Sequence, residues 1–415
     1  MTTDPSLHRL LAGPPIPGGP ESHVEHIARL GGLPVEAASR GLIPSLVASG
    51  LLGRGGAGFP VGRKWRAMAD RSGGRAVVVA NGAEGEPASF KDRVLMAGRP
   101  HLVIDGAILA AEAVGADEIV FYVGREHEAA VDAMRRAVAE RKREIRMPAR
   151  IVEAPIGYVS GEATAAVNYI NRKDARPTTT PPRMSERGVR GRPTLVQNVE
   201  SLAYAALIAR FGEGWYRSAG RFESRGTGLV TISGAARDAG VREIELGTTV
   251  GEVAAAAGAR REWTGAVVLG GYFGTWAAAA DAWDLPLDPA VMRSAGLTFG
   301  CGIVGFLPVE SCGVSATAQI IAYLAKESAA QCGPCLHGLR ALAEATERVA
   351  IGRAEDDDLD RIERLTVQTA GRGACHHPDG AVQLLASALN VFGDDFHRHA
   401  RTGRCSVSGA QAGVR

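Results

Sequence analysis

The residues of this 415-residue chain best suited to ligand chemistry begin with segment 53–65, which reads GRGGAGFPVGRKW. Glycine permits positive φ angles and lets a ligand approach the main chain closely. Successive N–H groups in such a loop can bind a phosphate, and Lys64 would add a positive charge. The spacing matches neither the GxGxxG turn of a Rossmann fold nor the GxxxxGK[ST] P-loop. A flexible surface loop is the alternative, although linkers seldom contain an aromatic residue such as Phe59.

A second polar segment, 81–93, reads NGAEGEPASFKDR and directly follows the apolar run 76–80. That run predicts a buried parallel strand. Polar residues at the carboxyl end of such a strand occupy the usual ligand position of an open α/β sheet. The chain has only five lysines against 42 arginines, and Lys64 and Lys91 both fall in these two segments. We therefore expect the two segments to form one binding site.

Three cysteines form the third candidate group. Cys332 and Cys335 make a CxxC pair, and Cys375 follows within the sequence GACHHP. Six cysteines in a chain of this length are too few for a disulfide framework, so this group indicates metal or redox chemistry in a reducing cytoplasm. The other three cysteines, Cys301, Cys312 and Cys405, are interpreted as small hydrophobic residues or free thiols.

Strand and helix patterns alternate between residues 76 and 153, which predicts a parallel sheet built from βαβ units. A short helix over 43–52 should lead into the glycine-rich loop. Segment 226–271 predicts two strands, a helix and another strand. Segments 308–350 and 356–392 have helical periodicity and predict a bundle with the cysteines at its joints.

Composition excludes several classes of protein. Hydrophobic residues make up 46% of the chain and charged residues 22%, as in an ordinary globular protein of two to four domains. The net charge of +2 gives no reason to expect nucleic acid as a partner. Residues 1–20 lack the apolar core of a signal peptide, and no apolar run is long enough to insert in a membrane. We expect a cytoplasmic protein.

The two ligand segments together resemble the NADH-oxidising flavoprotein subunit of respiratory complex I and its relatives in soluble hydrogenases and formate dehydrogenases. That family carries GRGGAGFPTGxKW followed by an NADExEPGTFKDR-like segment. Residues 157–165, GYVSGEATA, resemble its GAYICGEETAL, and residues 193–201, PTLVQNVES, resemble its PTTVNNVET. Taken alone, these two stretches are equally typical of a helix N-terminus capped by Ser160 and of an ordinary strand-to-helix junction. The resemblance extends from about residue 40 to about residue 400.

The resemblance implies an α/β flavin-binding domain, a small β-grasp domain of the soluble-ligand-binding type, and a C-terminal helical bundle carrying the cysteine site. The implied boundaries are an N-terminal extension to residue 40, lying on the surface, then 41–222, 223–303 and 304–400, with a tail over 401–415. FMN would bind between the loops, receive hydride from NADH and pass electrons to a [4Fe-4S] cluster. A single phosphate-binding loop favours FMN over FAD.

The resemblance also assigns site residues. Glu86 and Glu162 would act beside the flavin as catalytic residues, and Glu84 would join them in an acidic ring. The implied cofactor-binding residues are Gly53, Arg54, Gly55, Gly56, Gly58, Phe59, Lys64, Asn81, Glu84, Tyr158, Gly161, Glu162 and Asn198.

Several NADH-facing positions depart from the family. Phe59 retains the first stacking ring, but the second ring is replaced by Ala67. The lysine and phenylalanine of the family's KPPFPA segment become Thr180 and Arg183, and the second glutamate of GEETAL becomes Ala163. Each aromatic stack contributes roughly 0.5–1.5 kcal/mol beyond buried area, so we expect weaker NADH binding than in relatives with all three rings.

The family's cysteine motif, ESCGxCxPCREG, aligns here with its first ligand replaced by Ala329. Three interpretations remain open. The cysteines Cys332, Cys335 and Cys375 could hold a [4Fe-4S] or [3Fe-4S] cluster with a foreign fourth ligand, could bind zinc, or could have lost the metal. Fourth-ligand candidates for the cluster are a small molecule, His337, His376, Gln331 and Cys312. For zinc they are His376 and His377.

The sequence therefore predicts an FMN-dependent electron-transfer oxidoreductase subunit that resembles an NADH dehydrogenase. Its partners would be other redox subunits or a ferredoxin, and it could lie at the periphery of a membrane complex without inserting in the membrane. One alternative is a flavoprotein that uses a ferredoxin or a membrane redox partner instead of NADH. Another is a non-catalytic assembly subunit that holds zinc or has an empty cysteine site.

Overall fold

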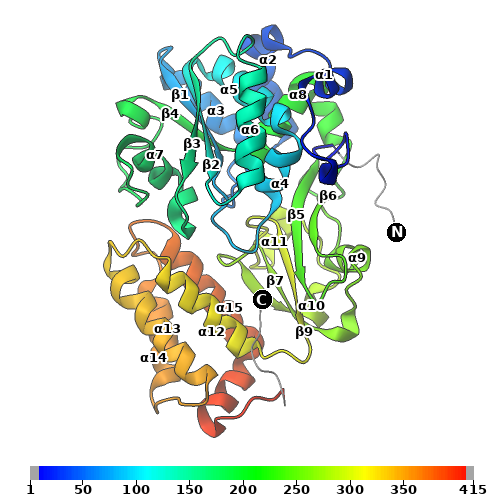
Figure 1. Cartoon of the computed structure of the whole chain (residues 1–415). Coiled ribbons are helices and arrows are strands. Elements are labelled where there is room, and N and C mark those ends of the chain that lie inside the picture. Colours follow the sequence, from blue (N-terminus) through cyan, green and yellow to red (C-terminus); the bar gives the residue numbers. More distant parts are fainter. Residues whose placement is uncertain (1–8, 408–415) are drawn as a thin grey trace. The chain divides into compact units, whose positions relative to one another are not determined.

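The computed structural model describes residues 9–407, apart from the side chains of residues 37–40. The chain divides into two compact units (Figure 1). The first contains the residues up to Val230 together with 241–248 and 288–290, and the second contains 231–240, 249–287 and the residues from Val291 onward. The flavin-binding domain predicted over 41–222 is therefore embedded in a larger unit that later segments complete.

The first unit is an α/β structure whose sheet is entirely parallel, as the βαβ pattern predicts. The strand order is β3-β2-β1-β4. Its elements, in chain order, are η2 (Ile16–Gly18), α1 (His23–Leu30), α2 (Val35–Ser49), α3 (Val61–Ser72), β1 (Ala76–Gly82), α4 (Lys91–Gly98), α5 (Pro100–Val114), β2 (Ala116–Gly124), α6 (Glu128–Glu140), β3 (Ala149–Ala154), η3 (Tyr158–Gly161), α7 (Ala163–Arg172), η4 (Val189–Gly191), β4 (Thr194–Asn198) and α8 (Val199–Arg217).

The continuous apolar run of β1 reflects burial on both faces of the sheet. Val78 and Ala80 belong to the larger core, with residues of α2, α3, α5, α6 and α8. Val77 and Val79 face a smaller core that includes residues of α7. A strand covered on both sides needs apolar side chains at every position, which explains why the run does not alternate.

The N-terminal extension does not lie on the surface as expected. Leu10 is fully buried in the larger core, and the buried Arg99 side chain donates hydrogen bonds to the carbonyls of Leu11, Ala12 and Pro14. Helix α2 also begins earlier than the predicted helix over 43–52, at Val35. Packing against the α/β core thus orders a segment whose composition suggested a surface position.

A second, five-stranded sheet has the order β6-β5-β9-β7-β8. Strand β9 pairs parallel with β5 and antiparallel with β7, which also pairs antiparallel with β8. The predicted strand-strand-helix-strand order of segment 226–271 is present, and β8 and β9 extend it. The elements of this region are β5 (Thr227–Gly234), β6 (Gly240–Glu245), α9 (Val250–Ala256), η5 (Arg261–Trp263), β7 (Thr264–Leu269), β8 (Thr275–Ala278), α10 (Ala279–Ala282), α11 (Pro289–Ser294) and β9 (Ile303–Pro308).

The C-terminal region of the second unit is helical, as predicted, and its long helices lie side by side (Figure 1). Its elements are α12 (Gly313–Lys326), the π-helix η6 (Pro334–Leu339), α13 (Arg340–Ala350), α14 (Asp358–Thr369) and α15 (His377–Thr402). Apolar side chains such as Leu324, Leu342 and Ile362 are buried among them. Helix α15 is kinked at Phe392, where φ is −115°.

No single helix within residues 9–407 has both the length and the hydropathy needed to cross a membrane. Helices α4 and α5 pass that test only as a pair, and they meet at an angle of 98°.

Candidate functional site

The glycine-rich segment forms a closed loop that leads into the N-terminus of α3. Leu52 and Pro60 form an antiparallel bridge, and the Gly53 N–H donates to the Phe59 carbonyl at 2.9 Å. Within the loop, φ is +100° at Gly56 and +63° at Gly58, a region that side chains disfavour. The loop therefore depends on glycine at these positions, as the sequence predicts.

Arg54 anchors this loop to the core. Its backbone N–H donates to the Ser201 hydroxyl at 2.9 Å. Its buried guanidinium donates to the carbonyl of Thr227 and to the Tyr216 hydroxyl, and lies 3.7 Å from Glu200. The arginine predicted to bind the cofactor thus uses its side chain to hold the loop in place.

Lys64 lies in the first turn of α3 and is the cation best placed to receive an anion. Its Nζ donates to the Val196 carbonyl at 2.5 Å, and no carboxylate of the described residues pairs with it. Burial lowers the pKa of Lys64 to about 8 because no negative charge offsets the loss of water. A helix N-terminus, a glycine loop and an unneutralised lysine suit a phosphate group such as that of FMN.

Asn81 and Asn198 hold two other segments at the same sheet edge. The Asn81 side chain donates to the Gly161 carbonyl at 2.8 Å. Asn198 caps α8 through the Glu200 N–H and donates to Asp92 at 2.7 Å. A Cβ at Gly55 would lie 3.4 Å from the Cβ of Asn198, so the glycine loop reaches this edge. The predicted loops therefore converge on the carboxyl ends of β1 and β4.

The three glutamates of the predicted acidic ring have different roles. Glu84 accepts the N–H groups of Asp92 and Arg93 at the start of α4, and the Ser89 hydroxyl. Glu162 accepts the N–H groups of Thr164 and Ala165 and is the cap of α7. Both carboxylates stabilise helix N-termini, where backbone dipoles favour negative charge.

Glu86 is the glutamate paired with another predicted site residue. Its carboxylate accepts the Tyr158 hydroxyl at 2.9 Å and the N–H of Ala88 at 3.2 Å. The side chain of Ser160, proposed above as the helix cap, donates instead to the Gly157 carbonyl. Glu162 displaces it because the cap position belongs to the residue directly before Ala163.

Sequence reasoning did not assign the buried ion pairs beneath the site. Lys91 Nζ lies 2.7 Å from Asp92 and 3.0 Å from Glu200. Burial alone would lower the pKa of Lys91, but Asp92 and Glu200 raise it well above its ordinary value. The signal was available, since a lysine in this lysine-poor chain follows an expected strand. Its use is structural, because its charge is satisfied within the protein.

Exposed rings flank the predicted ligand segments. The Phe59 side chain is 53% exposed and Phe90 is 43% exposed, with the Arg93 guanidinium 4.5 Å from the Phe90 ring centre. Thr180 and Arg183 are exposed and Ala67 is partly exposed. The three family positions that lost their family residues thus remain accessible to a ligand.

The three predicted metal-binding cysteines lie together in the second unit. Cys335 is buried on the π-helix η6, and the N–H groups of Ala374 and Cys335 donate to the Cys332 sulfur. Burial and the thiols of Cys332 and Cys375 raise the pKa of Cys335 to about 12. Clustered thiols with N–H donors to sulfur are the surroundings that an iron–sulfur cluster requires.

The spacing of these thiols favours a cluster over a single zinc ion. Tetrahedral zinc with Zn–S bonds of about 2.3 Å needs sulfurs about 3.8 Å apart. Among the described residues, the groups that meet a single-ion criterion of 4.8 Å between all ligand atoms do not include Cys332, Cys335 and Cys375. A cluster spreads its thiolates over several irons and so tolerates wider spacing.

The structure narrows the choice of a fourth ligand. The His376 side chain is 98% exposed and lies 3.3 Å from Asp379, whereas the His377 Nε2 lies 2.7 Å from the Leu324 carbonyl. Gln331 and His337 are exposed, and Cys312 lies against His399 instead. Ala329 occupies the family's first cysteine position.

Comparisons with known proteins agree with both halves of this description. Residues 46–206 match the model of the Nuo51 FMN-binding domain, and residues 315–399 match that of the NADH-ubiquinone oxidoreductase-F iron-sulfur binding region. A crystal structure of an NAD+-reducing [NiFe]-hydrogenase in the H2-reduced state is similar with a TM-score of 0.83 and 27% identity. That match covers 92% of this chain and 67% of the hydrogenase chain.

Curated relatives align along most of their length. The NADH-quinone oxidoreductase F-subunit numbered 2 of Rhizobium meliloti (strain 1021) is 31% identical over 86% of this chain and 88% of the relative. The corresponding F-subunit of Escherichia coli (strain K12) is 32% identical over 84% and 82%, respectively. The chain therefore belongs to the family of NADH-quinone oxidoreductase F-subunits, as the glycine-rich loop and the cysteine pattern predicted.

Proposed function

We propose that this chain is the NADH-oxidising subunit of a multi-subunit redox enzyme, with FMN in its first unit and an iron–sulfur cluster in its second. FMN would accept two electrons as hydride and release them singly. The observation that best supports the flavin site is Lys64, a buried cation at a helix N-terminus with no carboxylate partner among the described residues. The glycine loop and the two asparagines would hold the flavin beside it.

Glu86 is the acidic residue best suited to act at the flavin. Its carboxylate is held by the Tyr158 hydroxyl, whereas Glu84 and Glu162 are engaged by helix N-termini. Glu86 and Tyr158 would position the reacting ring of NADH or the flavin and limit further negative charge there. Glu162 would then contribute through the placement of α7, and Glu84 through α4.

Three cysteines support the proposed cluster in the helical region. Cys332, Cys335 and Cys375 would bind three irons, and the fourth iron would take a small molecule in place of the thiolate lost at Ala329. The five-stranded mixed sheet with α9 fits the β-grasp domain predicted over 223–303, to which we assign a spacing role. Other redox subunits are the proposed partners, in the cytoplasm or at the periphery of a membrane complex.

The lost stacking rings favour a second candidate function of the same chemistry. With Ala67, Thr180 and Arg183 at NADH-facing positions, a reduced ferredoxin or a membrane redox partner could supply or accept electrons instead of NADH. The two functions differ in one measurement, the rate at which NADH reduces the bound flavin.

Anaerobic purification with flavin, iron, acid-labile sulfide and zinc measured on one sample tests the proposal. We expect one FMN per chain, with iron and sulfide in cluster ratio. Addition of NADH should then bleach the flavin. A chain with no flavin and no sulfide would instead be a non-catalytic assembly subunit.

A further inference from the structure

A second group of metal-binding side chains lies in the helical region, formed by residues that the proposed function does not use. Cys312 precedes α12, His399 lies near the end of α15, and Cys405 follows that helix. Their ligand atoms all lie within 4.8 Å of one another. His399 is buried and both cysteines are partly buried. Three ligand-type side chains from separate segments are thus brought together away from bulk water.

The distance within this group matches zinc geometry. The Cys312 Sγ lies 3.5 Å from the His399 Nε2. In a tetrahedral site, Zn–S bonds of about 2.3 Å and Zn–N bonds of about 2.0 Å place sulfur and nitrogen about 3.5 Å apart. The two atoms therefore stand where a shared ion requires them, before any rearrangement.

Neighbouring groups orient both of these ligands. The Nδ1 of His399 lies 3.1 Å from the Ala350 carbonyl at the end of α13, so that Nδ1 carries the proton and Nε2 presents its lone pair toward Cys312. A histidine that binds a metal commonly has such a carbonyl partner on its other nitrogen. The Cys312 sulfur accepts the Ser315 N–H at 3.4 Å, and the N-terminus of α12 favours its thiolate form.

Packing of the backbone holds the third ligand in place. Gly352 and Gly403 have φ angles of +70° and +64°, and a Cβ at Gly352 would lie 2.6 Å from the Gly403 carbonyl oxygen. The turn after α13 and the turn after α15 are therefore in close contact. This contact fixes the direction in which the chain leaves α15 and brings Cys405 to Cys312.

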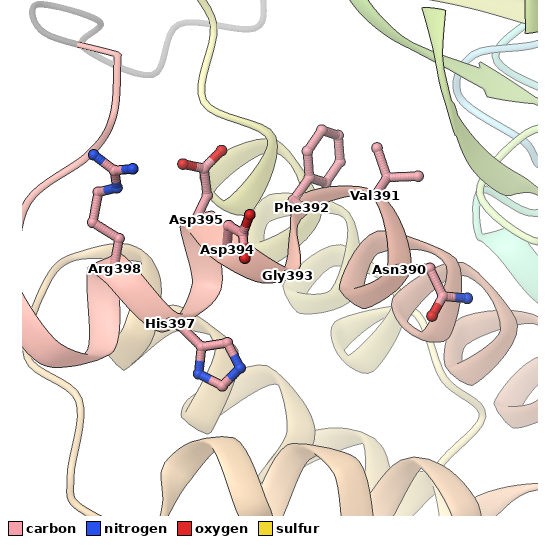
Figure 2. A pocket seen from close by; sticks show the side chains of 8 residues that line it. All are labelled: Asn390, Val391, Phe392, Gly393, Asp394, Asp395, His397 and Arg398. Atoms are coloured by element: carbon pink, nitrogen blue, oxygen red, sulfur yellow. The ribbon is translucent and has the colours of Figure 1, made fainter. Parts of the chain in front are cut away.

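The face of α15 that carries His399 points toward the start of α12. Phe392 lies on this face, because a Cβ at Gly313 would meet its ring at 2.4 Å. Figure 2 shows Asp395 on the same side of the helix as Phe392, with His397 on the opposite side. Asp395 precedes His399 by one turn, and its charge acts on the Cys405 thiol. A carboxylate is thus available near the fourth position of the site.

We propose that Cys312, His399 and Cys405 bind one Zn²⁺ ion, with the Asp395 carboxylate or a water molecule as the fourth ligand. Two thiolates would neutralise the charge of the ion, and imidazole and thiolate are ligands that zinc prefers. The ion would join the start of α12 to the end of α15. It would be distinct from the cluster on Cys332, Cys335 and Cys375.

Zinc analysis of the full chain and of Cys405→Ser tests the proposal. Cys405 lies beyond the last helix, so this variant should fold, and Cys301→Ser is the matched control. Each protein would be incubated with Zn²⁺ under reducing conditions, desalted, and analysed for zinc, iron and sulfide. We expect one zinc per chain in the wild type and in the control, and its loss in Cys405→Ser with iron and sulfide unchanged.

Substitution of Co²⁺ for Zn²⁺ gives an independent readout. Tetrahedral cobalt bound by thiolates should show d–d absorption bands in the red that are absent from Cys405→Ser and Cys312→Ser. Equal zinc content in Cys405→Ser and the wild type would overturn the assignment. So would a Cys312–Cys405 disulfide found by mass spectrometry in protein purified under reducing conditions. Because iron and sulfide are measured on the same samples, failure of the zinc site is distinguishable from failure of the proposed cluster.

Discussion

Asn81 and Asn198 are paired residues at the ends of β1 and β4, and each donates its side-chain amide to a different segment of the site. Asn81 holds the turn at Gly161, and Asn198 holds Asp92 at the start of α4. Both contacts are made by the protein's own groups, so the sheet edge is organised before a cofactor arrives. Preorganisation of this kind limits the entropy lost on binding.

Lys64→Met should weaken FMN binding strongly. A hydrogen bond to a charged group contributes about 1.5–3 kcal/mol, which corresponds to roughly a tenfold to hundredfold change in Kd. Fluorescence titration of the flavin-free protein with FMN measures the change. Lys142→Met, at an exposed position, is the matched control and should bind FMN as the wild type does. Equal affinity in the two variants would remove Lys64 from the site.

The pH dependence of FMN binding should follow the same side chain. Burial lowers the pKa of Lys64 to about 8 in the flavin-free protein, so the positive charge is present below that pH and lost as the pH rises through it. FMN affinity should therefore fall above about pH 8. In Lys64→Met, titrated across the same range of pH, this decrease should be absent. A parallel decrease in both proteins would assign the effect to another group.

Gly56→Val should abolish flavin retention. The +100° φ angle at Gly56 excludes a β-branched residue without strain, which costs on the order of 1–3 kcal/mol, and the side chain would occupy the ligand's approach. Flavin per chain after gel filtration is the measurement. Gly214→Val, in α8 with open space around its Cβ position, is the control. Stoichiometric flavin in Gly56→Val would show that the loop has another role.

NADH should bind less tightly here than in relatives that carry all three stacking rings, and Ala67→Phe should strengthen binding. One restored stack of roughly 0.5–1.5 kcal/mol corresponds to about a twofold to tenfold gain. Anaerobic titration with NADH, followed through flavin bleaching, measures both affinities. Ala67→Leu adds apolar area without a ring and separates stacking from burial. Tight stoichiometric bleaching of the wild type would contradict the prediction.

Ala329→Cys should restore a fourth thiolate to the cluster. The wild type is expected to hold a cluster on three cysteines, with a higher reduction potential and a tendency to lose one iron as [3Fe-4S]. Electron paramagnetic resonance of the oxidised and reduced anaerobic proteins should show conversion to a stable [4Fe-4S] cluster in the variant. Ala330→Cys is the positional control. About one zinc at Cys332, Cys335 and Cys375, without acid-labile sulfide, would rule out the cluster.

The sequence predicted the parallel sheet and the convergence of its loops because both depend on local patterns. The apolar run of β1 indicates burial on both faces, and polar residues directly after it must lie at the sheet edge. The roles of Glu84 and Glu162 could not be predicted in the same way. A carboxylate that caps a helix and a carboxylate that faces a cofactor both occur in loops after strands, and only the course of the backbone distinguishes them.

Long-range partners were the other part beyond prediction. Arg54 is attached to a glycine loop in sequence, yet its side chain bonds to Thr227 and Tyr216. Cys312 and Cys405 were interpreted as isolated thiols because 92 residues separate them. Such contacts depend on tertiary packing, which periodicity and spacing along the chain do not report.

The burial of the N-terminal segment bears on how the flavin-binding part of this protein could be produced alone. Removing residues before 41 would take Leu10 from the core and leave the buried Asp105 without its partner His26. Ending the chain at residue 222 would remove Glu243, which accepts the Thr227 hydroxyl and the Leu10 N–H. The excised stretch 41–222 should therefore aggregate on expression. A soluble fragment must keep the N-terminal helices and the returning segments 241–248 and 288–290.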